Sequence, residues 1–244
     1  MRLKCEYKTK EIPVGYNMLL VSLIKEALKK SDENYFNKLY KYDENIANKR
    51  SKNFTFAAYI KNYERAEEIF KVNDRVILNI SSPDLEFMIN LYNGLLKLSK
   101  FQYKTFELYK LKIDLIKEKK LATNEVIFKT LSPICIKNKN NYFMKIEDDK
   151  YIDELNYIAN LVLKNYRGEG LRENLMFMPL DMKKVVVKEE IRGFKSKTNR
   201  KYLYVNSYSG TFKMKGNVKD LEDLYALGVG FKRNQGFGMI EVIG

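Results

Sequence analysis

The chain contains a glycine-rich segment whose residue types suit a phosphate-bearing ligand. It consists of two glycine pairs with two cations between them: Gly228, Gly230, Lys232, Arg233, Gly236 and Gly238. Glycine lets the backbone approach a ligand closely and supplies positive φ angles. Lysine and arginine donate charge-assisted hydrogen bonds to phosphate oxygens. The segment therefore predicts a phosphate site, and the alternative is a tight helix-to-strand connection. The spacing differs from that of a dinucleotide-binding loop, and the segment follows a helix-like stretch rather than a strand.

The composition removes the side chain most often used for proton transfer. The 244 residues include no histidine, so any acid–base step must use another group. Cys5 and Cys135 do not form a metal-binding motif, and each lies in an apolar, strand-like run. We therefore expect reduced, buried cysteines, no metal ion and no cofactor.

The charge balance favours a polyanionic partner. Lysine and arginine number 45 against 31 aspartate and glutamate residues, a formal charge of +14. This surplus suits nucleic acid or an anionic membrane face, although a genomic bias toward lysine would give the same surplus without a site. A membrane-surface role is least favoured because the cations are not gathered on one amphipathic helix. Without a long apolar run or the apolar core of a signal peptide, we expect a cytoplasmic protein.

The hydrophobic periodicity of the first half predicts the order strand, helix, strand, strand, helix, strand. The predicted segments are a strand at 3–7, helices at 16–28 and 32–40, strands at 53–60 and 75–80, a helix at about 83–96 and a strand at 104–116. Ser82 is the expected N-cap of the third helix, with Pro83 at its first position. The expected apolar face of that helix comprises Leu85, Met88, Ile89, Tyr92, Leu95 and Leu96.

The second half repeats this order after a charged link at 117–120. The predicted segments are strands at 126–136 and 142–146, a helix at 151–166, strands at 183–191 and 201–213, a helix at 217–225 and a strand at 237–243. Gly168 and Gly228 are expected to end the two helices. The order βαββαβ is that of a ferredoxin-like unit. We therefore predict an α+β protein of two tandem ferredoxin-like (RRM-like) domains, residues 1–120 and 121–244.

The strands predicted at 183–191 and 201–213 would form a basic hairpin. Its cations are Lys183, Lys184, Lys188, Arg192, Lys195, Lys197, Arg200 and Lys201. Contacts from such cations to phosphates would position an RNA strand rather than read its bases. The alternative is a solvated hairpin without a ligand.

The glycine-rich segment resembles the signature of the CRISPR-associated endoribonucleases that process repeat RNA, the sixth protein of the Cas series in the RAMP superfamily. That signature comprises two Gly-hydrophobic-Gly triplets separated by five residues that include Lys or Arg. Residues 228–230 and 236–238 match the two triplets, with Lys232 and Arg233 between them. Three other stretches are similar: Ile12-Pro13 with Tyr16-Asn17, Phe54-Thr55-Phe56 and Ser132-Pro133-Ile134.

The resemblance implies two ferredoxin-like domains and a metal-independent reaction on CRISPR repeat RNA. The 2′-hydroxyl of the RNA attacks the adjacent phosphate and leaves a 2′,3′-cyclic phosphate and a 5′-hydroxyl. The protein must align the attacking oxygen, move protons and stabilise the charge on the phosphorane. The resemblance also implies that the glycine-rich segment and the basic hairpin bind the RNA. Other CRISPR-associated subunits and a second copy of the chain are further expected partners.

Many relatives place a histidine upstream of the Phe-Thr-Phe stretch, and this chain has none. Tyr40, in the context Leu39-Tyr40, takes that position, with Tyr42 and Ala47 as other placements. A tyrosine with its ordinary pKa near 10 is a poor base at neutral pH, although it can donate a proton. Lys29 and Lys52 are the further candidate catalytic residues, because they could stabilise charge.

Three interpretations of the missing histidine stay open: a slow nuclease, a protein that retains RNA without cutting it, and an engineered inactive form. The competing function is that of a non-catalytic RNA-binding subunit of a CRISPR surveillance complex. An unrelated ferredoxin-like nucleic-acid binder is a third possibility.

Overall fold

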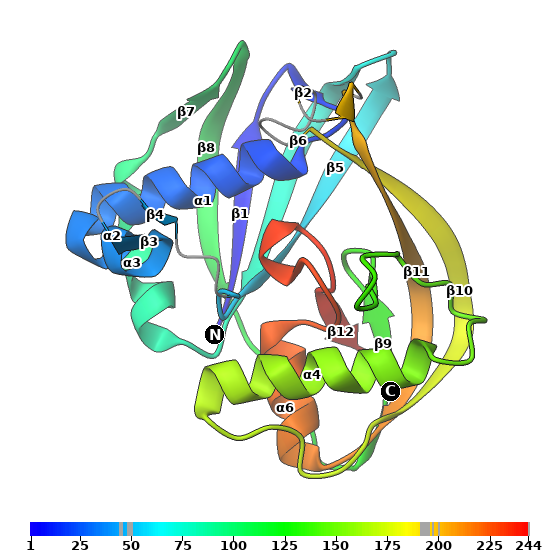
Figure 1. Ribbon diagram of the computed structural model, residues 1–244. Coiled ribbons are helices and arrows are strands. Elements are labelled where there is room, and N and C mark those ends of the chain that lie inside the picture. The colour runs from blue at the N-terminus through cyan, green and yellow to red at the C-terminus, as the bar shows by residue number, and fades with distance from the viewer. Residues whose placement is uncertain (44–45, 48–50, 191–195, 197, 200, 244) are drawn as a thin grey trace.

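The computed structural model describes residues 1–43, 46–47, 51–190, 196, 198–199 and 201–243, and it shows an α+β protein with two main antiparallel sheets (Figure 1). The strands of the first half are β1 (Arg2–Lys8), β2 (Glu11–Pro13), β3 (Lys41–Asp43), β4 (Ile46–Ala47), β5 (Thr55–Arg65), β6 (Ile69–Ser81), β7 (Lys100–Tyr103) and β8 (Phe106–Ile116). Its helices are α1 (Asn17–Ser31), α2 (Glu33–Tyr40) and α3 (Leu85–Lys97).

The second half contributes a four-stranded sheet with two helices. Its strands are β9 (Glu125–Thr130), β10 (Met176–Glu189), β11 (Leu203–Lys215) and β12 (Ile240–Val242). Its helices are α4 (Tyr151–Arg167) and α6 (Val218–Leu227), and a short 3-10 turn covers Arg233–Gln235. As expected, Gly168 ends α4 with a left-handed backbone and Gly228 ends α6.

The two main sheets share one strand order. The first runs β2-β6-β1-β8-β7, with β5 also paired to β6, and the second runs β10-β11-β9-β12. In the first half β1 and β6 lie side by side in the middle, with β8 on one side and β5 on the other. In the second half β9 and β11 take the middle positions, with β12 on one side and β10 on the other. This arrangement places β5 and β10, each the first strand of a long hairpin, at the edges of the two sheets.

Helices α1 and α3 pack against each other on one face of the first sheet. Gly94 makes this contact possible, because a Cβ at that position would lie only 1.8 Å from the Ala27 carbonyl oxygen. The predicted apolar stripe of α1 is buried throughout, from Leu19 to Leu28. The core of the second half gathers Phe128, Phe212 and Leu163 between its sheet and α4.

The prediction for α3 needs two corrections. Its N-cap is Asp84, whose carboxylate accepts from the Phe87 N–H at 3.0 Å, whereas Ser82 accepts from the Asp84 N–H. The buried face comprises Phe87, Met88, Leu91, Gly94 and Leu95. Leu85, Ile89 and Leu96 of the expected face are instead more than half exposed. Met88 and Leu95 of the expected face are buried, so the prediction was correct in part, and the buried face is displaced around the helix from the predicted one.

Strand prediction was least accurate in the second half. Strand β9 ends at Thr130, and residues 142–146 form no described strand beyond an isolated bridge between Phe143 and Lys137. Strand β10 begins at Met176, well before the expected start, although it contains Pro179. Strand β10 lies at the edge of its sheet and pairs irregularly beside Pro179, and both are settings in which a strand tolerates proline.

Cys5 and Cys135 are buried free thiols, as expected from their apolar neighbours. Within the described residues, no three or more His, Cys, Asp or Glu side chains are placed to bind a metal ion. None of the helices in the described part of the chain is long and apolar enough to cross a membrane.

Buried hydrogen bonds join the two halves. The Arg2 guanidinium, 3% exposed, donates to the carbonyl oxygens of Tyr225 and Ile240 at 2.9 and 2.8 Å. The Ser132 hydroxyl donates to the Phe56 carbonyl oxygen at 3.1 Å. Two of the sequence stretches that carry the family resemblance therefore meet at this boundary.

Candidate nucleic-acid interface

The glycine-rich loop, residues 228–238, lies between the two sheets (Figure 1). Backbone hydrogen bonds of 2.8 Å fix its path, from Val229 N–H to the Gly238 carbonyl and from Gly238 N–H to the Pro133 carbonyl. The Thr55 hydroxyl of β5 donates to the Phe237 carbonyl at 3.0 Å. The loop is thus anchored to both halves of the protein.

The four glycines of the loop are buried and pack against the chain itself. All have positive φ angles of 70–87°. A Cβ would lie 2.8 Å from the Gly238 oxygen at Gly228, 2.7 Å from the Cys135 oxygen at Gly230, 2.8 Å from Asn17 at Gly236 and 1.9 Å from the Val229 oxygen at Gly238. Packing within the protein is therefore enough to require every one of these glycines, which favours the tight-connection alternative.

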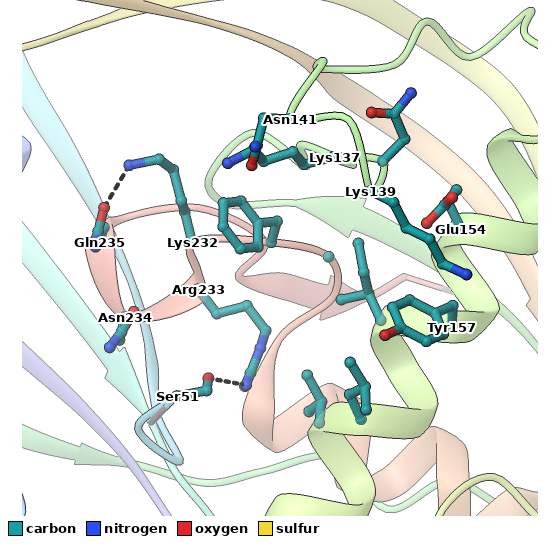
Figure 2. A pocket seen from close by; sticks show the side chains of 16 residues that line it. Ser51, Lys137, Lys139, Asn141, Glu154, Tyr157, Lys232, Arg233, Asn234 and Gln235 are labelled. Atoms are coloured by element: carbon teal, nitrogen blue, oxygen red, sulfur yellow. Dashed lines mark hydrogen bonds between the residues drawn. The ribbon is translucent and has the colours of Figure 1, made fainter. Parts of the chain in front are cut away.

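The two cations of the loop also bond inside the protein (Figure 2). Lys232 Nζ lies 2.7 Å from the carboxylate of Glu189, a fully buried residue. Burial raises the pKa of Glu189, and the Lys232 ammonium opposes this shift. Arg233, only 2% exposed, donates to the Leu227 carbonyl at 2.6 Å and to the Ser51 hydroxyl at 2.9 Å. Burial lowers the pKa of Arg233 to about 10. As placed here, Arg233 presents almost no surface to a ligand.

A cleft of about 580 Å³ opens beside the loop, between α4 and residues 137–141 (Figure 2). Lys137 Nζ lies 5.1 Å from the Phe231 ring centroid, and Lys139 Nζ lies 5.5 Å from that of Tyr157. Phe231 is 37% exposed and Tyr157 47%. Aromatic rings with adjacent lysines suit single-stranded nucleic acid, because bases stack on the rings and phosphates bind the cations.

None of these four residues was selected from the sequence, although Phe231 lies within the glycine-rich segment. Lys137, Lys139 and Tyr157 are distant from the glycine-rich loop in sequence, and only the fold brings them beside Phe231. The sequence contains only a weak indication that these residues belong to a site, since lysine and tyrosine are abundant along the whole chain.

Tyr40 is the last residue of α2, and its half-buried ring lies between two lysines. Lys25 Nζ lies 4.7 Å from the ring centroid and Lys52 Nζ 5.5 Å. The Phe36 ring packs against Tyr40 with the centroids 5.1 Å apart. Burial raises the pKa of Tyr40 and lowers the pKa of Lys25. The Tyr40 phenol is therefore neutral at neutral pH, where it can donate a proton but accepts one poorly.

The structure separates Lys29 from the other two candidate catalytic residues. Tyr40 and Lys52 lie together, whereas Lys29 is exposed and forms an ion pair with Glu33 at 3.5 Å. The lysine of α1 that faces the Tyr40 ring is Lys25, one turn earlier and not selected from the sequence.

A second cleft, of about 300 Å³, adjoins this group and includes Lys52 in its lining. Ser51 lines both clefts. Its hydroxyl accepts from Arg233, and its carbonyl accepts from the Asn165 side chain of α4 at 3.1 Å. The glycine-rich loop and α4 thereby hold the segment that carries Lys52, next to the Tyr40 ring.

The basic hairpin is described only in part. Lys183 and Lys184 are exposed on β10. Arg192, Lys195, Lys197 and Arg200 lie outside the described residues. The described residues next to the turn of the hairpin contact the first half through ion pairs of Lys201 with Glu68 and of Glu190 with Lys104. The long strands β10 and β11 therefore extend from the second half to the turn between β5 and β6 (Figure 1).

Comparisons with known proteins agree with this architecture. A CRISPR-associated endoribonuclease Cas6 of Methanocaldococcus jannaschii is 25% identical to the chain, over 98% of this chain and 92% of the relative. A RAMP protein described as binding different RNA substrates has a similar structure, with a TM-score of 0.80 at 22% identity and full coverage of both chains. The product of a Cas6-related gene from Pyrococcus furiosus has a TM-score of 0.77 at 22% identity, covering 100% of this chain and 98% of that chain. At these identities the two structures show the fold.

The family model is more specific. The model of the C-terminal part of the CRISPR-associated protein Cas6 matches residues 116–242, just over half of the chain, and this range includes the whole glycine-rich loop. The chain therefore belongs to the Cas6 family of CRISPR-associated proteins.

Proposed function

We propose that this protein binds CRISPR repeat RNA and cleaves it slowly without a metal ion, leaving a 2′,3′-cyclic phosphate and a 5′-hydroxyl. The observation that carries the proposal is that Ser51 lines both clefts. This residue borders the cleft beside the glycine-rich loop that contains Phe231 and Tyr157, here called the aromatic cleft. Ser51 also directly precedes Lys52, which lies beside Tyr40. An RNA strand bound in the cleft beside the glycine-rich loop would extend into the second cleft, where the RNA backbone would lie next to Lys52. The related endoribonuclease of M. jannaschii supports the choice of reaction.

The repeated strand order supports two ferredoxin-like domains. The proposed boundary stays between residues 120 and 121, within the connection from β8 to β9. In both halves the order of the flanking and central strands is the one that the βαββαβ unit requires.

We propose different roles for the exposed and the buried cations. Lys137, Lys139, Lys183 and Lys184 would contact phosphates. The same role is proposed from the sequence for the hairpin residues outside the described part of the chain, Arg192, Lys195, Lys197 and Arg200. Lys232, Arg233 and the loop glycines Gly228, Gly230, Gly236 and Gly238 would support RNA binding indirectly, by holding the loop between the halves.

For the chemistry, Lys52 and Lys25 would stabilise negative charge on the phosphorane, and the Tyr40 hydroxyl would donate to the leaving oxygen. Lys29 takes no direct part in this scheme, because it pairs with Glu33. Because a phenol with a raised pKa is a poor base, the proton of the 2′-hydroxyl would pass to water, and this step should limit the rate.

The direct test is a cleavage assay with labelled CRISPR repeat RNA and excess EDTA, with a scrambled RNA of equal length as control. We expect preferential retention of the repeat and slow formation of a cyclic-phosphate product. Lys52→Ala should slow cleavage by about 10²-fold, whereas Lys29→Ala should leave the rate unchanged. Stable retention without turnover at any pH would instead identify a non-catalytic subunit. Equal affinity for the scrambled RNA would contradict both roles and indicate an unrelated binder.

The aromatic cleft makes a separate prediction about how binding depends on salt. Phe231→Ala should weaken RNA binding by about 1–3 kcal/mol, roughly 5- to 150-fold, because a base loses its stacking partner. Its salt dependence should not change, since no charge is removed. Lys137→Ala should instead reduce the slope of log affinity against log salt by about 0.7, as expected for one phosphate contact on a single strand. Fluorescence anisotropy at several salt concentrations distinguishes the two effects, and equal slopes for both variants would contradict the assignment.

A further inference from the structure

A side chain of the second half holds the chain on both sides of Lys52. The side-chain amide of Asn165, near the end of α4, donates to the Ser51 carbonyl at 3.1 Å and to the Asn53 side-chain oxygen at 3.0 Å. An amide nitrogen has two hydrogens to donate, and these two bonds use both of them. Ser51 and Asn53 flank Lys52 in the sequence. One amide therefore connects α4 to the residues before and after this lysine.

The location of Lys52 makes such support necessary. Residues 51–54 belong to neither a helix nor a strand, so no regular hydrogen-bond ladder fixes their backbone. Lysine has a long, flexible side chain, and the position of its backbone decides which groups the ammonium can reach. Lys52 is only 4% exposed, and its ammonium lies 5.5 Å from the centroid of the Tyr40 ring. A small displacement of this segment would therefore move the ammonium away from the phenol.

Asn165 is carried by a rigid part of α4. Two residues later, Arg167 forms ion pairs with Asp220 at 2.7 Å and with Asp223 at 2.5 Å, both on α6. Asp220 is fully buried, and α4 packs into the core of the second half through side chains such as Leu163. The last turn of α4 is thus fixed in place, and the amide of Asn165 is a defined anchor for the segment of Lys52.

A second contact supports the same segment from the glycine-rich loop. Arg233 donates to the Ser51 hydroxyl at 2.9 Å (Figure 2). Arg233 is buried and also donates to the Leu227 carbonyl, so a substitution there would disturb the loop as well. Asn165 is exposed on the surface of its helix. Its contribution can therefore be measured while the loop stays intact.

We propose that Asn165 is a positioning residue for the cleavage reaction and acts by keeping Lys52 at the scissile phosphate. This inference rests on the proposed function, in which Lys52 stabilises the charge on the phosphorane. A group that acts on the transition state through Lys52 contributes to the rate of cleavage more than to the affinity for RNA. Its contribution cannot exceed that of Lys52 itself.

The test combines a substitution of Asn165 with the removal of Lys52. Asn165→Leu removes both hydrogen bonds at nearly constant side-chain size and without a change of charge. In single-turnover assays with saturating protein, it should cleave CRISPR repeat RNA about tenfold more slowly, at an unchanged dissociation constant. Asn165→Gln keeps the amide and should recover part of the rate. In the Lys52→Ala background, Asn165→Leu should cause no further loss, because the group that Asn165 positions is gone.

Asn156→Leu is the matched control on the same helix. The Asn156 amide also donates two hydrogen bonds, to the carbonyls of Ile152 and Leu175 at 3.0 Å each, and none of these three residues lines the cleft of Lys52. This variant should cleave like the unaltered protein, and thermal melting shows whether each variant is folded.

The outcomes separate the inference from the proposed function. Normal cleavage by Asn165→Leu, or an equal further loss in the Lys52→Ala background, would overturn the positioning role and leave the proposed function intact. If Lys52→Ala cleaves as fast as the unaltered protein, or the unaltered protein retains RNA without cutting it, the proposed chemistry is wrong and the positioning role is wrong with it.

Discussion

Replacing Tyr40 with histidine should accelerate metal-independent cleavage of CRISPR repeat RNA by about 10² to 10⁴-fold, the range of general acid–base catalysis. The position lies between Lys25 and Lys52, with their ammonium groups about 5 Å from the present ring. Nearby positive charge and partial burial both lower the pKa of an imidazole. The histidine should therefore be neutral at pH 7 and able to accept the proton of the attacking hydroxyl.

The pH dependence of the cleavage rate shows whether the new histidine acts as a base. For Tyr40→His, the cleavage rate should rise with pH through the imidazole pKa and then level off, because only the neutral ring acts as a base. The unaltered chain should show no such step between pH 5 and 7, since burial raises the pKa of Tyr40 well above this range. Single-turnover assays across pH would show both profiles.

Tyr40→Phe is the control for packing. It keeps the aromatic ring between the lysines and removes only the hydroxyl, so it should bind RNA normally without the gain in rate. If Tyr40→His binds the repeat normally and cleaves no faster than the unaltered chain, Tyr40 does not lie at the scissile phosphate.

Gly238→Ala should unfold the protein more readily than any other single substitution in the glycine-rich loop. The new methyl group would lie 1.9 Å from the Val229 carbonyl oxygen, at a φ of 70° that alanine rarely adopts. The contact is with backbone in the interior, so no flexible side chain can move aside. We expect a loss of about 4 kcal/mol or more in the free energy of unfolding, measured by urea denaturation.

Gly168→Ala separates the clash from the backbone strain. Gly168 has a similar φ of 83°, but a Cβ there meets no atom within 4 Å. This control should lose only about 1–2 kcal/mol, the cost of a left-handed backbone. Equal losses for the two variants would mean that the loop relaxes around the methyl group and is less tightly packed than described.

Local sequence patterns predicted the elements whose burial follows one simple period. Alternation identified β1, and apolar spacing identified α1 with its correct face. The same reasoning predicted α3 and the burial of Met88 and Leu95, but it also included Leu85, Ile89 and Leu96, which the fold leaves exposed. It also extended β9 too far, since Ser132 and Pro133 end the strand pairing that the neighbouring apolar residues favour.

The sequence predicted a site at the glycine-rich segment but did not predict why its glycines are needed. The glycine pattern identified the segment, yet the reason for the glycines is contact with distant atoms such as the Cys135 oxygen and Asn17. No local pattern contains that information. Likewise, whether Lys25 or Lys29 faces Tyr40 depends on how α2 packs against α1, which spacing along one helix does not specify.

The hydrogen bond between Arg233 and Ser51 spans 182 residues of sequence, and this has a consequence for biosynthesis. During translation, the segment that carries Lys52 leaves the ribosome long before the arginine that holds it exists. The segment that carries Lys52 therefore lacks this hydrogen bond until the glycine-rich loop has been made and inserted. Under the proposed function, the RNA site beside Lys52 would therefore be completed only after the glycine-rich loop has folded against Ser51.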